Sequence, residues 1–526
     1  MHITTSRCEQ FRSIDGRGNN LQNPDWGKAG EAFPRRLPVD YADLTGAPSG
    51  ADRPNPRVIS NNVMADPSRN REPAMRSGMV WAWGQFIDHD ITSTPNSGAM
   101  DWNISVPVGD PAFDPKREGK AIIPFSRSTA ADGTGTGPDN PRQQINAITS
   151  WLDGSMVYGS DAVRAAALRS FEEGKLRVAE SEHGPMLPAN TLGLPNDNPT
   201  RRPTESLLLA GDTRANENLA LVSLQTLFVR EHNRVADELA RQHPEWDDQE
   251  LYLRARRQVG AEIAAITYNE FLPALLGPDA LPAYAGYQPE VDGRIGNEFA
   301  TAAYRMGHSQ IDPIVWREAA DGGAIPEKDL PLVATYFAPE RLSEGGIEPL
   351  LRGLTRFIQE PTDEKITSQV RNMLFGRPGH GGMDLAALNI QRGRDHGLPN
   401  YNAIRQAYGF EPITSFAQLT SDPVKVGKLT YTYGEVEKLD AWVGLLAEDP
   451  APEAAVGPTL KSILVDQFTR LRDGDRFWYQ NDPGLADQRE QLDSLSLADV
   501  IRRNTDIGDD IDDSPFFGEK FIRSKP

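Results

Sequence analysis

The sequence predicts a mainly α-helical protein, built as a single large domain with long loops and little β structure. Apolar residues recur at helical spacing over long segments, such as 216–242 and 247–276. Alternating patterns typical of strands are few and short. We find no internal repeat, and the Pro/Ala-rich segment 448–458 is too short for a linker between domains. One helical domain therefore fits the chain better than several.

Along the chain, residues 1–72 are rich in Gly, Pro and Asn without a strong period, which predicts an irregular N-terminal arm packed on a helical domain, 73–526. A helix is expected from about 73 to 91, and the segment 92–145 reads as loop. Further helices are expected at about 216–242, 247–276, 297–311, 363–375, 400–408, 434–446 and 457–471.

Composition excludes several classes of protein. The net charge of −20 argues against nucleic acid or an anionic membrane as the main partner. No stretch approaches the roughly 20 apolar residues that span a bilayer. Cys8 is the single cysteine, so no intramolecular disulfide forms. The first residues carry no apolar leader, so we expect a cytoplasmic protein, or one secreted or held at the cell surface by a non-classical route. The oligomeric state is left open.

The apolar segment 83–95, WGQFIDHDITSTP, carries a histidine between two aspartates. On a helix, Gln85, Asp88 and His89 share one face, and Asp90 lies on nearly the opposite side from Asp88. A histidine in such a helix is by itself more often a structural residue than a catalyst. Two carboxylates beside it favour a functional site, because buried carboxylates need partners such as a metal or a covalent bond.

A second segment, TSWLDGS, places polar groups at alternating positions. In an extended strand, Thr149, Trp151, Asp153 and Ser155 would point the same way. Hydroxyl, carboxylate and backbone carbonyl oxygens suit Ca²⁺. The alternative is a polar loop that caps a helix.

Two further segments are ambiguous by themselves. In GDTRANEN, Arg214 and Glu217 have the spacing of a surface ion pair at a helix start. In EFATAAYRMGHSQI, His308 follows an apolar helix with Arg305 one turn earlier, and suits a core position as well as a ligand. His232, flanked by charges, reads as a structural hydrogen-bonding residue.

Taken in this order, the segments resemble the animal-type haem peroxidase family of the peroxidase–cyclooxygenase superfamily. The resemblance spans about residues 80–480, and the stretches that carry it are WGQFIDHD, INAITSWLDGSMVYGS, GDTRANEN, LFVREHNRVADEL, YRMGH, LAALNIQRGRDHGLPNYN and LRDGDRFWY. The scarcity of cysteine, the absence of a leader, and Asn218 where some mammalian members have Met suggest a bacterial-type member.

The resemblance implies a role for each matching residue. His89, Gln85 and Arg214 match the distal catalytic residues; His308 matches the proximal iron ligand, and Asn389 the asparagine that holds its other ring nitrogen. Asp88 and Glu217 match the acids that esterify the haem, and Arg305 and Arg392 look like partners of its propionates. Asp90, Thr149, Trp151 (by its carbonyl), Asp153 and Ser155 match the calcium ligands. The implied cofactors are a haem b derivative and Ca²⁺.

The resemblance implies a peroxidase that reduces H₂O₂ and oxidises halide, thiocyanate or small aromatic donors. Members with Met after the ester-forming glutamate make a third, sulfonium link to the haem. Asn218 stands there in this chain, so we expect two ester links at most, and bromide, iodide or thiocyanate as donors rather than chloride. The neutral partner Asn389 favours a relatively high reduction potential.

Three alternatives compete with this prediction. A fatty-acid dioxygenase of the same superfamily would carry a radical-forming Tyr three residues before the proximal histidine, where this chain has Arg305; Tyr304 is four before. A metallohydrolase could use His89, Asp90, Asp395 and His396, but would leave Arg214 and His308 unexplained. A calcium-dependent binding protein without catalysis would have no use for His89 and Arg214.

Overall fold

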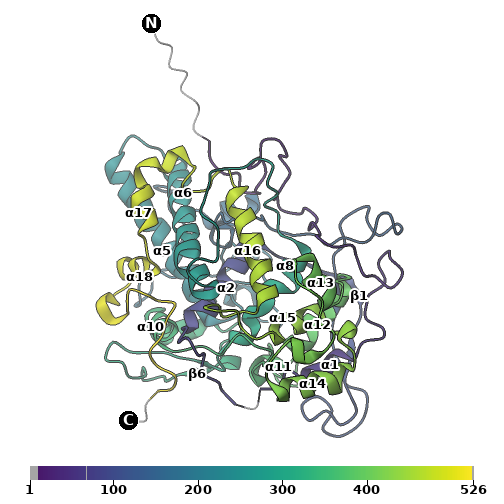
Figure 1. Cartoon of the computed structure of the whole chain (residues 1–526). Coiled ribbons are helices and arrows are strands. Elements are labelled where there is room, and N and C mark those ends of the chain that lie inside the picture. Colours follow the sequence, from purple (N-terminus) through teal and green to yellow (C-terminus); the bar gives the residue numbers. More distant parts are fainter. Residues whose placement is uncertain (1–9, 67, 524–526) are drawn as a thin grey trace.

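Helix α2 (Gly78–Ile91) crosses the centre of the computed structural model, which describes residues 10–66 and 68–523 (Figure 1). Cys8 lies outside the described residues. The Ser77 side chain caps the helix by accepting from the Met79 N–H. Most of α2 is buried, and the rings of Trp83 and Phe86 pack against Phe228 of α5 (Leu219–Gln242), with centroids 5.6 and 5.3 Å apart. This packing on several sides holds the helix in one position.

The described residues are mainly helical, as the sequence predicts. The other α-helices are α1 (Pro56–Asn62), α3 (Ser155–Tyr158), α4 (Ala162–Leu168), α6 (Asp248–Ile266), α7 (Leu272–Leu276), α8 (Asn297–Thr301), α9 (Gly307–Gln310), α10 (Glu348–Arg356), α11 (Ser368–Arg371), α12 (Leu385–Asp395), α13 (Tyr401–Ala407), α14 (Pro423–Tyr433), α15 (Ala441–Ala447), α16 (Pro458–Asp473), α17 (Arg489–Asp493) and α18 (Leu497–Asn504). A π-helical turn, η2 (Thr267–Phe271), joins α6 to α7, and a 3₁₀ turn, η3 (Ala303–Met306), joins α8 to α9.

Strands are few and short among the described residues. They form two-stranded antiparallel pairs: β1 (Asn96–Asp101) with β4 (Ser126–Ser128), β2 (Ile104–Ser105) with β3 (Ile122–Ile123), and β5 (Ile314–Val315) with β6 (Leu330–Pro331). The first two pairs lie within the segment 92–145, which the sequence predicts as loop.

The N-terminal arm lies against the domain. Gly27 has φ +76°, and a Cβ atom there would come within 2.4 Å of the Trp151 indole nitrogen. The Gly27 carbonyl accepts from the Ser150 N–H at 2.9 Å. Only glycine permits so close an approach with this backbone. The arm also contains helix α1, which the sequence did not predict, and the arm–domain boundary at residue 72 stays a prediction.

Several helix boundaries differ from the prediction. Helix α2 begins at Gly78 rather than about 73, because Ser77 caps it. The segment 297–311 is not one helix: its backbone breaks at Ala302 (φ −127°, ψ −62°). Only Ser368–Arg371 is helical within 363–375, and the helix expected from 434 begins at Ala441. Helices α10, α12, α14 and α18 were not predicted.

No helix of the described residues is long and apolar enough to cross a lipid bilayer.

Candidate active site

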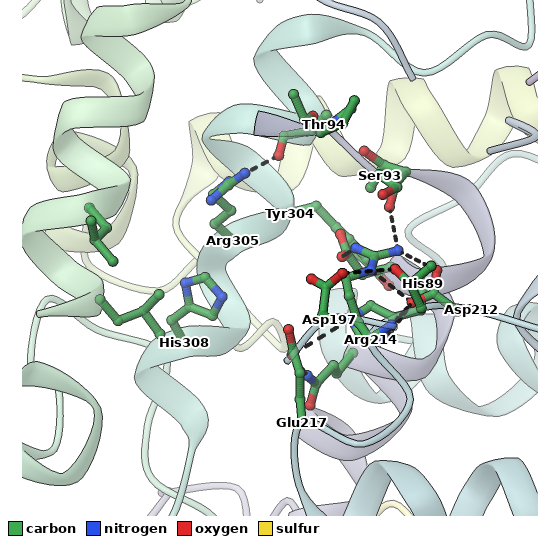
Figure 2. Close-up of a pocket in the computed structure, with 18 of the residues that line it drawn as sticks. His89, Ser93, Thr94, Asp197, Asp212, Arg214, Glu217, Tyr304, Arg305 and His308 are labelled. Atoms are coloured by element: carbon green, nitrogen blue, oxygen red, sulfur yellow. Dashed lines mark hydrogen bonds and ion pairs between the residues drawn. The ribbon is translucent and has the colours of Figure 1, made fainter. Parts of the chain in front are cut away.

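A cavity of about 1030 Å³ lies at the centre of the molecule. Its walls come from α2, from the turn that precedes α5, from the broken segment α8–η3–α9, and from α12. His89 and His308 both line it, and Figure 2 shows them on opposite sides in that view. Segments far apart in the sequence therefore meet around one space large enough for a bulky cofactor.

His89 is 3% exposed. Burial and the charge of Arg214 lower its pKa to about 3, so the imidazole is neutral near pH 7. Its Nδ1 has no hydrogen-bond partner among the described residues and lies 3.5 Å from Oδ1 of Asp212. A proton on Nδ1 would face this carboxylate and leave Nε2 with a free lone pair. Nε2 is 4.0 Å from Oε2 of Glu217.

Asp212 is a site residue that the sequence analysis missed. Arg214 donates to its two carboxylate oxygens from Nε and Nη2, each at 2.8 Å, and Nη2 also donates to the Thr92 carbonyl at 2.9 Å. Burial disfavours the Asp212 carboxylate, but the charge of Arg214 and the hydrogen bonds that it donates outweigh burial and lower the pKa of Asp212. The GDTR motif holds a signal for this pair, because an aspartate two residues before a buried arginine can hold it in a fork-like geometry.

Arg214 and Glu217 do not form the surface ion pair that their spacing favours by itself. Both precede α5 in a turn, in which the Glu217 N–H donates to the Arg214 carbonyl, and both line the cavity. Arg214 lies instead 3.4 Å from Oδ2 of Asp88. Arg214, in the turn before α5, and Asp88, in α2, are therefore the ion pair that faces the cavity.

A chain of amides connects α2 to the start of α5. The Asn218 side chain accepts from the Leu221 N–H and so caps α5. Its amide nitrogen donates to Oε1 of Gln85 at 2.9 Å, and Nε2 of Gln85 donates to Oε2 of Glu217 at 2.8 Å. Asn218 thus determines which end of the Gln85 amide faces Glu217.

Asp88 and Glu217 are carboxyl groups with raised pKa values. The side chain of Asp88 is 28% exposed and that of Glu217 is 21% exposed, and both line the cavity. Burial raises the pKa of Asp88 to about 6, against the opposing charge of Arg214. Burial also raises the pKa of Glu217 to about 8. At both acids the charge of Arg214 opposes burial but does not outweigh it.

On the other wall, Nδ1 of His308 lies 2.6 Å from the amide nitrogen of Asn389, in α12. Burial and the charge of Arg305 lower the pKa of His308 to about 3, so this imidazole is also neutral near pH 7. Arg305 donates to the amide oxygen of Asn389 at 3.1 Å and to the Ala300 carbonyl. No carboxylate of residues 10–66 and 68–523 forms an ion pair with Arg305, and burial lowers its pKa to about 10.

Arg392 also lines the cavity but has many partners. Its Nη1 donates to the Ser126 carbonyl, the Ser128 hydroxyl and Oδ2 of Asp395, and its Nη2 donates to Asn96. Its guanidinium lies 4.1 Å from the Phe125 ring centroid. Arg392 is held in place more firmly than Arg305.

Of the two alternatives that the sequence left open for the segment 149–155, the structure shows the polar loop before a helix and not the extended strand. The segment forms bends, and Ser155 begins α3. The predicted side chains nevertheless meet: Ser155 donates to Oδ1 of Asp90 from both its N–H and its hydroxyl, and Thr149 donates to Oδ1 of Asp153 at 3.1 Å. The Trp151 carbonyl accepts from the Asp153 N–H at 2.9 Å. The bends of the backbone, and not an extended strand, bring these side chains together.

Asp90 of α2 and Asp153 are buried carboxyl groups, and both accept from the Ser155 N–H. Burial and the charge of Asp153 raise the pKa of Asp90, and burial raises the pKa of Asp153. Oδ2 of Asp153 has no hydrogen-bond partner in the described part of the chain, and its nearest cation, Arg256, lies at 3.9 Å. Asp90 points toward this segment, whereas Asp88 points toward the cavity, as the helical spacing predicts.

A family model described as animal haem peroxidase matches residues 11–516. The chain belongs to the animal haem peroxidase family. The match confirms the family that the sequence motifs indicate, and the chain is a haem-dependent peroxidase.

Peroxinectin A of Dictyostelium discoideum is 36% identical over 96% of this chain and 95% of its own length. The solved structure of peroxidase A from Dictyostelium discoideum superimposes with a TM-score of 0.90, at 36% identity, over 95% of this chain and 98% of the other. An Oryza sativa fatty acid alpha-dioxygenase has a TM-score of 0.80 at 25% identity, over 96% of this chain and 87% of its own. The peroxidase is thus the nearer of these two folds.

The residues of the alternative metallohydrolase site do not come together in the described part of the chain. His396 is buried, and its ring nitrogens contact the Ser128 and Thr301 hydroxyls, each at 2.8 Å. Asp395 pairs with Arg127 and Arg392. In the described ranges, no three His, Cys, Asp or Glu side chains lie close enough together to hold a metal ion. His232, as predicted, is a structural residue, bonded to Tyr158 and the Gly174 carbonyl.

Proposed function

We propose that this peroxidase uses H₂O₂ to oxidise small anionic or aromatic donors, with a haem b derivative held between His308 and His89. The observation that supports this most strongly is one cavity lined by two neutral histidines, with Arg214 beside one and Arg305 beside the other.

The residues around the cavity fit a haem. Arg305 lacks a carboxylate partner among the described residues, and a propionate would supply one. To bind iron through Nε2, His308 must carry its proton on Nδ1 and donate it to an oxygen. The Asn389 amide must then be flipped, so that its oxygen accepts from His308 and no longer from Arg305. A haem propionate would give Arg305 a new acceptor, and Arg392, which is held by Asp395, could bind the same propionate.

The proton transfers belong to His89. A bound haem would supply the two electrons that break the O–O bond and release one water molecule. His89, neutral through burial, accepts a proton from peroxide at Nε2 and returns it to the leaving oxygen. Arg214, held by Asp212, stabilises the negative charge that develops as the O–O bond breaks. Gln85 orients the peroxide or its product water from the same helix face as His89.

We propose ester links to the haem at Asp88 and Glu217. Both face the cavity, both have raised pKa values, and neither is tied down by a close bidentate arginine. Asn218 offers no thioether sulfur, so two esters remain the expected maximum. Without the electron-withdrawing sulfonium link, we expect bromide, iodide or thiocyanate to be better donors than chloride.

We further propose a Ca²⁺ site formed by Asp90, Thr149, Trp151 (through its carbonyl), Asp153 and Ser155. Two buried carboxylates, one with a free oxygen, favour a cation between them, and hydroxyl and carbonyl oxygens complete a set that suits Ca²⁺. Such an ion would fix the residue next to His89, and a catalytic base needs placement to a fraction of an ångström.

An absorption spectrum combined with acid–butanone extraction tests the haem proposal. We expect a Soret band that remains with the protein after extraction, and weaker retention in Asp88→Ala and in Glu217→Ala. A purified protein without a Soret band after haem is supplied would refute the cavity assignment. A Soret band that is fully extracted would refute only the ester links.

Halide choice is tested separately with monochlorodimedone near neutral pH. We expect bromination to be clearly faster than chlorination at equal halide concentration. Equal rates for the two halides would contradict the inference drawn from Asn218.

A further inference from the structure

A row of aromatic rings connects the cavity to a hollow on the surface. Tyr304 lines the cavity (Figure 2), and its ring lies 5.6 Å from that of Phe468 in α16. Phe468 lies 6.1 Å from Tyr268 in η2, and Tyr268 lies 4.7 Å from Trp478. All three centroid distances are typical of aromatic rings in contact, so no gap interrupts the row of four rings.

The row ends at a hollow of about 230 Å³ on the surface. Trp478 lies at its base, 4.7 Å from Tyr479 and 6.0 Å from Tyr284. Tyr268 and Tyr284 are half-buried and line the hollow together with Trp478, which is 3% exposed. The side chains that line the hollow therefore include every oxidisable ring of the row beyond Phe468.

Arg472 gives the hollow a polar anchor. It is 6% exposed, it lines the hollow, and its guanidinium lies 5.4 Å from the Tyr284 ring. Nε donates to Asp473 and Nη1 to the Pro282 carbonyl, but the buried Nη2 has no partner in the described residues. A hydroxyl or carboxylate of a bound molecule would satisfy that nitrogen.

We propose that this hollow is a second oxidation site, at which phenolic donors too large for the cavity give up electrons through the aromatic row. Any donor that enters the central cavity must share its space with the haem, which favours small donors there. The hollow requires a donor to bring only one phenol ring to the surface. The inference rests on the proposed function for its oxidant, the haem after it has reacted with peroxide.

Atoms and electrons balance over two turns. Each phenol gives one electron to the Trp478–Tyr268 end of the row and releases one proton to solvent, leaving a phenoxyl radical. The electron moves inward past Phe468 and Tyr304 to the peroxide-oxidised haem. The cavity takes up from solvent the two protons that match those released at the surface, so two phenols reduce one H₂O₂ to two water molecules. Trp478 can carry the charge without losing its proton, and Tyr479, which donates to Oδ1 of Asp493 at 2.8 Å, can pass its phenolic proton to that carboxylate.

The test uses the haem-loaded protein with two donors, free tyramine and tyramine coupled to dextran. Trp478→Phe and Tyr268→Phe keep the packing but remove an oxidisable ring. We expect each to slow oxidation of the dextran-bound donor about tenfold or more, while free tyramine is affected less than about twofold. Trp316→Phe is the matched control: this half-buried indole stacks on Phe357 outside the row, and its loss should leave both rates unchanged.

A readout independent of turnover is the oxidation of the protein itself. After peroxide is added without donor, mass spectrometry should find oxidised Trp478 or Tyr479 in the unaltered protein, and much less in Tyr268→Phe. Equal slowing of both donors by Trp478→Phe would overturn the proposal. The proposal would also be overturned if Trp478 became oxidised but dextran-bound tyramine did not react. The row would then carry electrons from the protein to the haem without serving a donor. If free tyramine were not oxidised while Trp478 still was, the result would contradict the proposed oxidation of small donors but not the electron transfer along the row.

Discussion

At the scale of single residues, Asp212 explains how a buried arginine and a neutral histidine can coexist. Its carboxylate binds Arg214 through two hydrogen bonds and lies 3.5 Å from Nδ1 of His89. We expect Asp212→Asn to slow the reaction with peroxide about 10- to 100-fold, because Arg214 loses its fork and His89 loses the charge that favours a proton on Nδ1. Stopped-flow spectroscopy at varied peroxide concentration measures this rate.

A matched control is Asp440→Asn. Asp440 forms the same two-bond contact with Arg394, from Nε at 2.9 Å and Nη2 at 2.7 Å, but does not line the cavity. The control should lower stability while the peroxide rate stays within about twofold of the unaltered protein. If Asp212→Asn behaved like its control, the carboxylate would have no part in the reaction.

Asn218 gives a second prediction at this scale. Asn218→Ala removes the α5 cap and the donor to Gln85, so we expect a loss of about 1 kcal/mol in the free energy of unfolding. The Gln85 amide would become free to turn, and the spin-state bands of the haem-loaded protein should shift. Asn218→Asp keeps the cap but removes the amide donor. It should restore stability without restoring the spectrum, and recovery of both would show that Gln85 is held in another way.

At the scale of elements, α2 serves both proposed sites, one on each face. Asp90→Ala should abolish stoichiometric calcium, measured by atomic emission, and lower the melting temperature, because Asp153 would be left as a buried carboxyl group without its partner. Added Ca²⁺ should raise the melting temperature of the unaltered protein and leave that of the variant unchanged. Calcium content that survives in Asp90→Ala would place the ion elsewhere.

The same helix shows what could be predicted from sequence. Its period places Asp88 and Asp90 on different faces, and in the structure they point to the cavity and to the segment 149–155. The period could not show that the segment 297–311 breaks at Ala302, because the break depends on packing: Thr301 contacts His396, a residue of the distant α12 end. Asp212 was missed for a related reason. Its role depends on the position of His89, which comes from another element.

The order of the family motifs along the chain predicted the site better than the spacing of residues within single segments did. The spacing of Arg214 and Glu217 favours a surface ion pair, which the structure does not show. The spacing of 149–155 left a strand or a polar loop before a helix open, and the structure shows bends that lead into α3. The resemblance nevertheless named residues that the fold brings around one cavity. Short-range spacing describes a residue's own helix or strand, whereas the ordered motifs of a family describe which segments meet.

At the scale of the whole molecule, ion pairs far from the cavity connect the long helices. Arg503 of α18 contacts both Glu231 of α5 and Glu262 of α6, at 2.6 and 3.0 Å. Asn504 and Arg234 add further hydrogen bonds to Glu231, but Oε2 of Glu262 is buried without a partner among the described residues. One guanidinium therefore serves two carboxyl groups, and they compete for it.

This competition predicts how stability depends on pH. Burial and the charge of Glu231 raise the pKa of Glu262 in the folded protein. Between the unfolded value of about 4.3 and the raised folded value, the folded state binds more protons than the unfolded state. The contribution of Glu262 to stability is therefore complete below about pH 4.3 and is lost as the pH rises through the folded pKa. Glu262→Gln, which stays neutral, should reduce the loss of stability between pH 5 and pH 8.

Urea unfolding of the haem-free protein at the two pH values measures this difference. Glu238→Gln is the control, since Glu238 forms an exposed pair with Arg234 on the same network and its side chain is 44% exposed. It should leave the pH dependence as it is in the unaltered protein. If Glu262→Gln did the same, Glu262 would be ionised in the folded state, and Arg503 would then hold both carboxylates together at the junction of α5, α6 and α18.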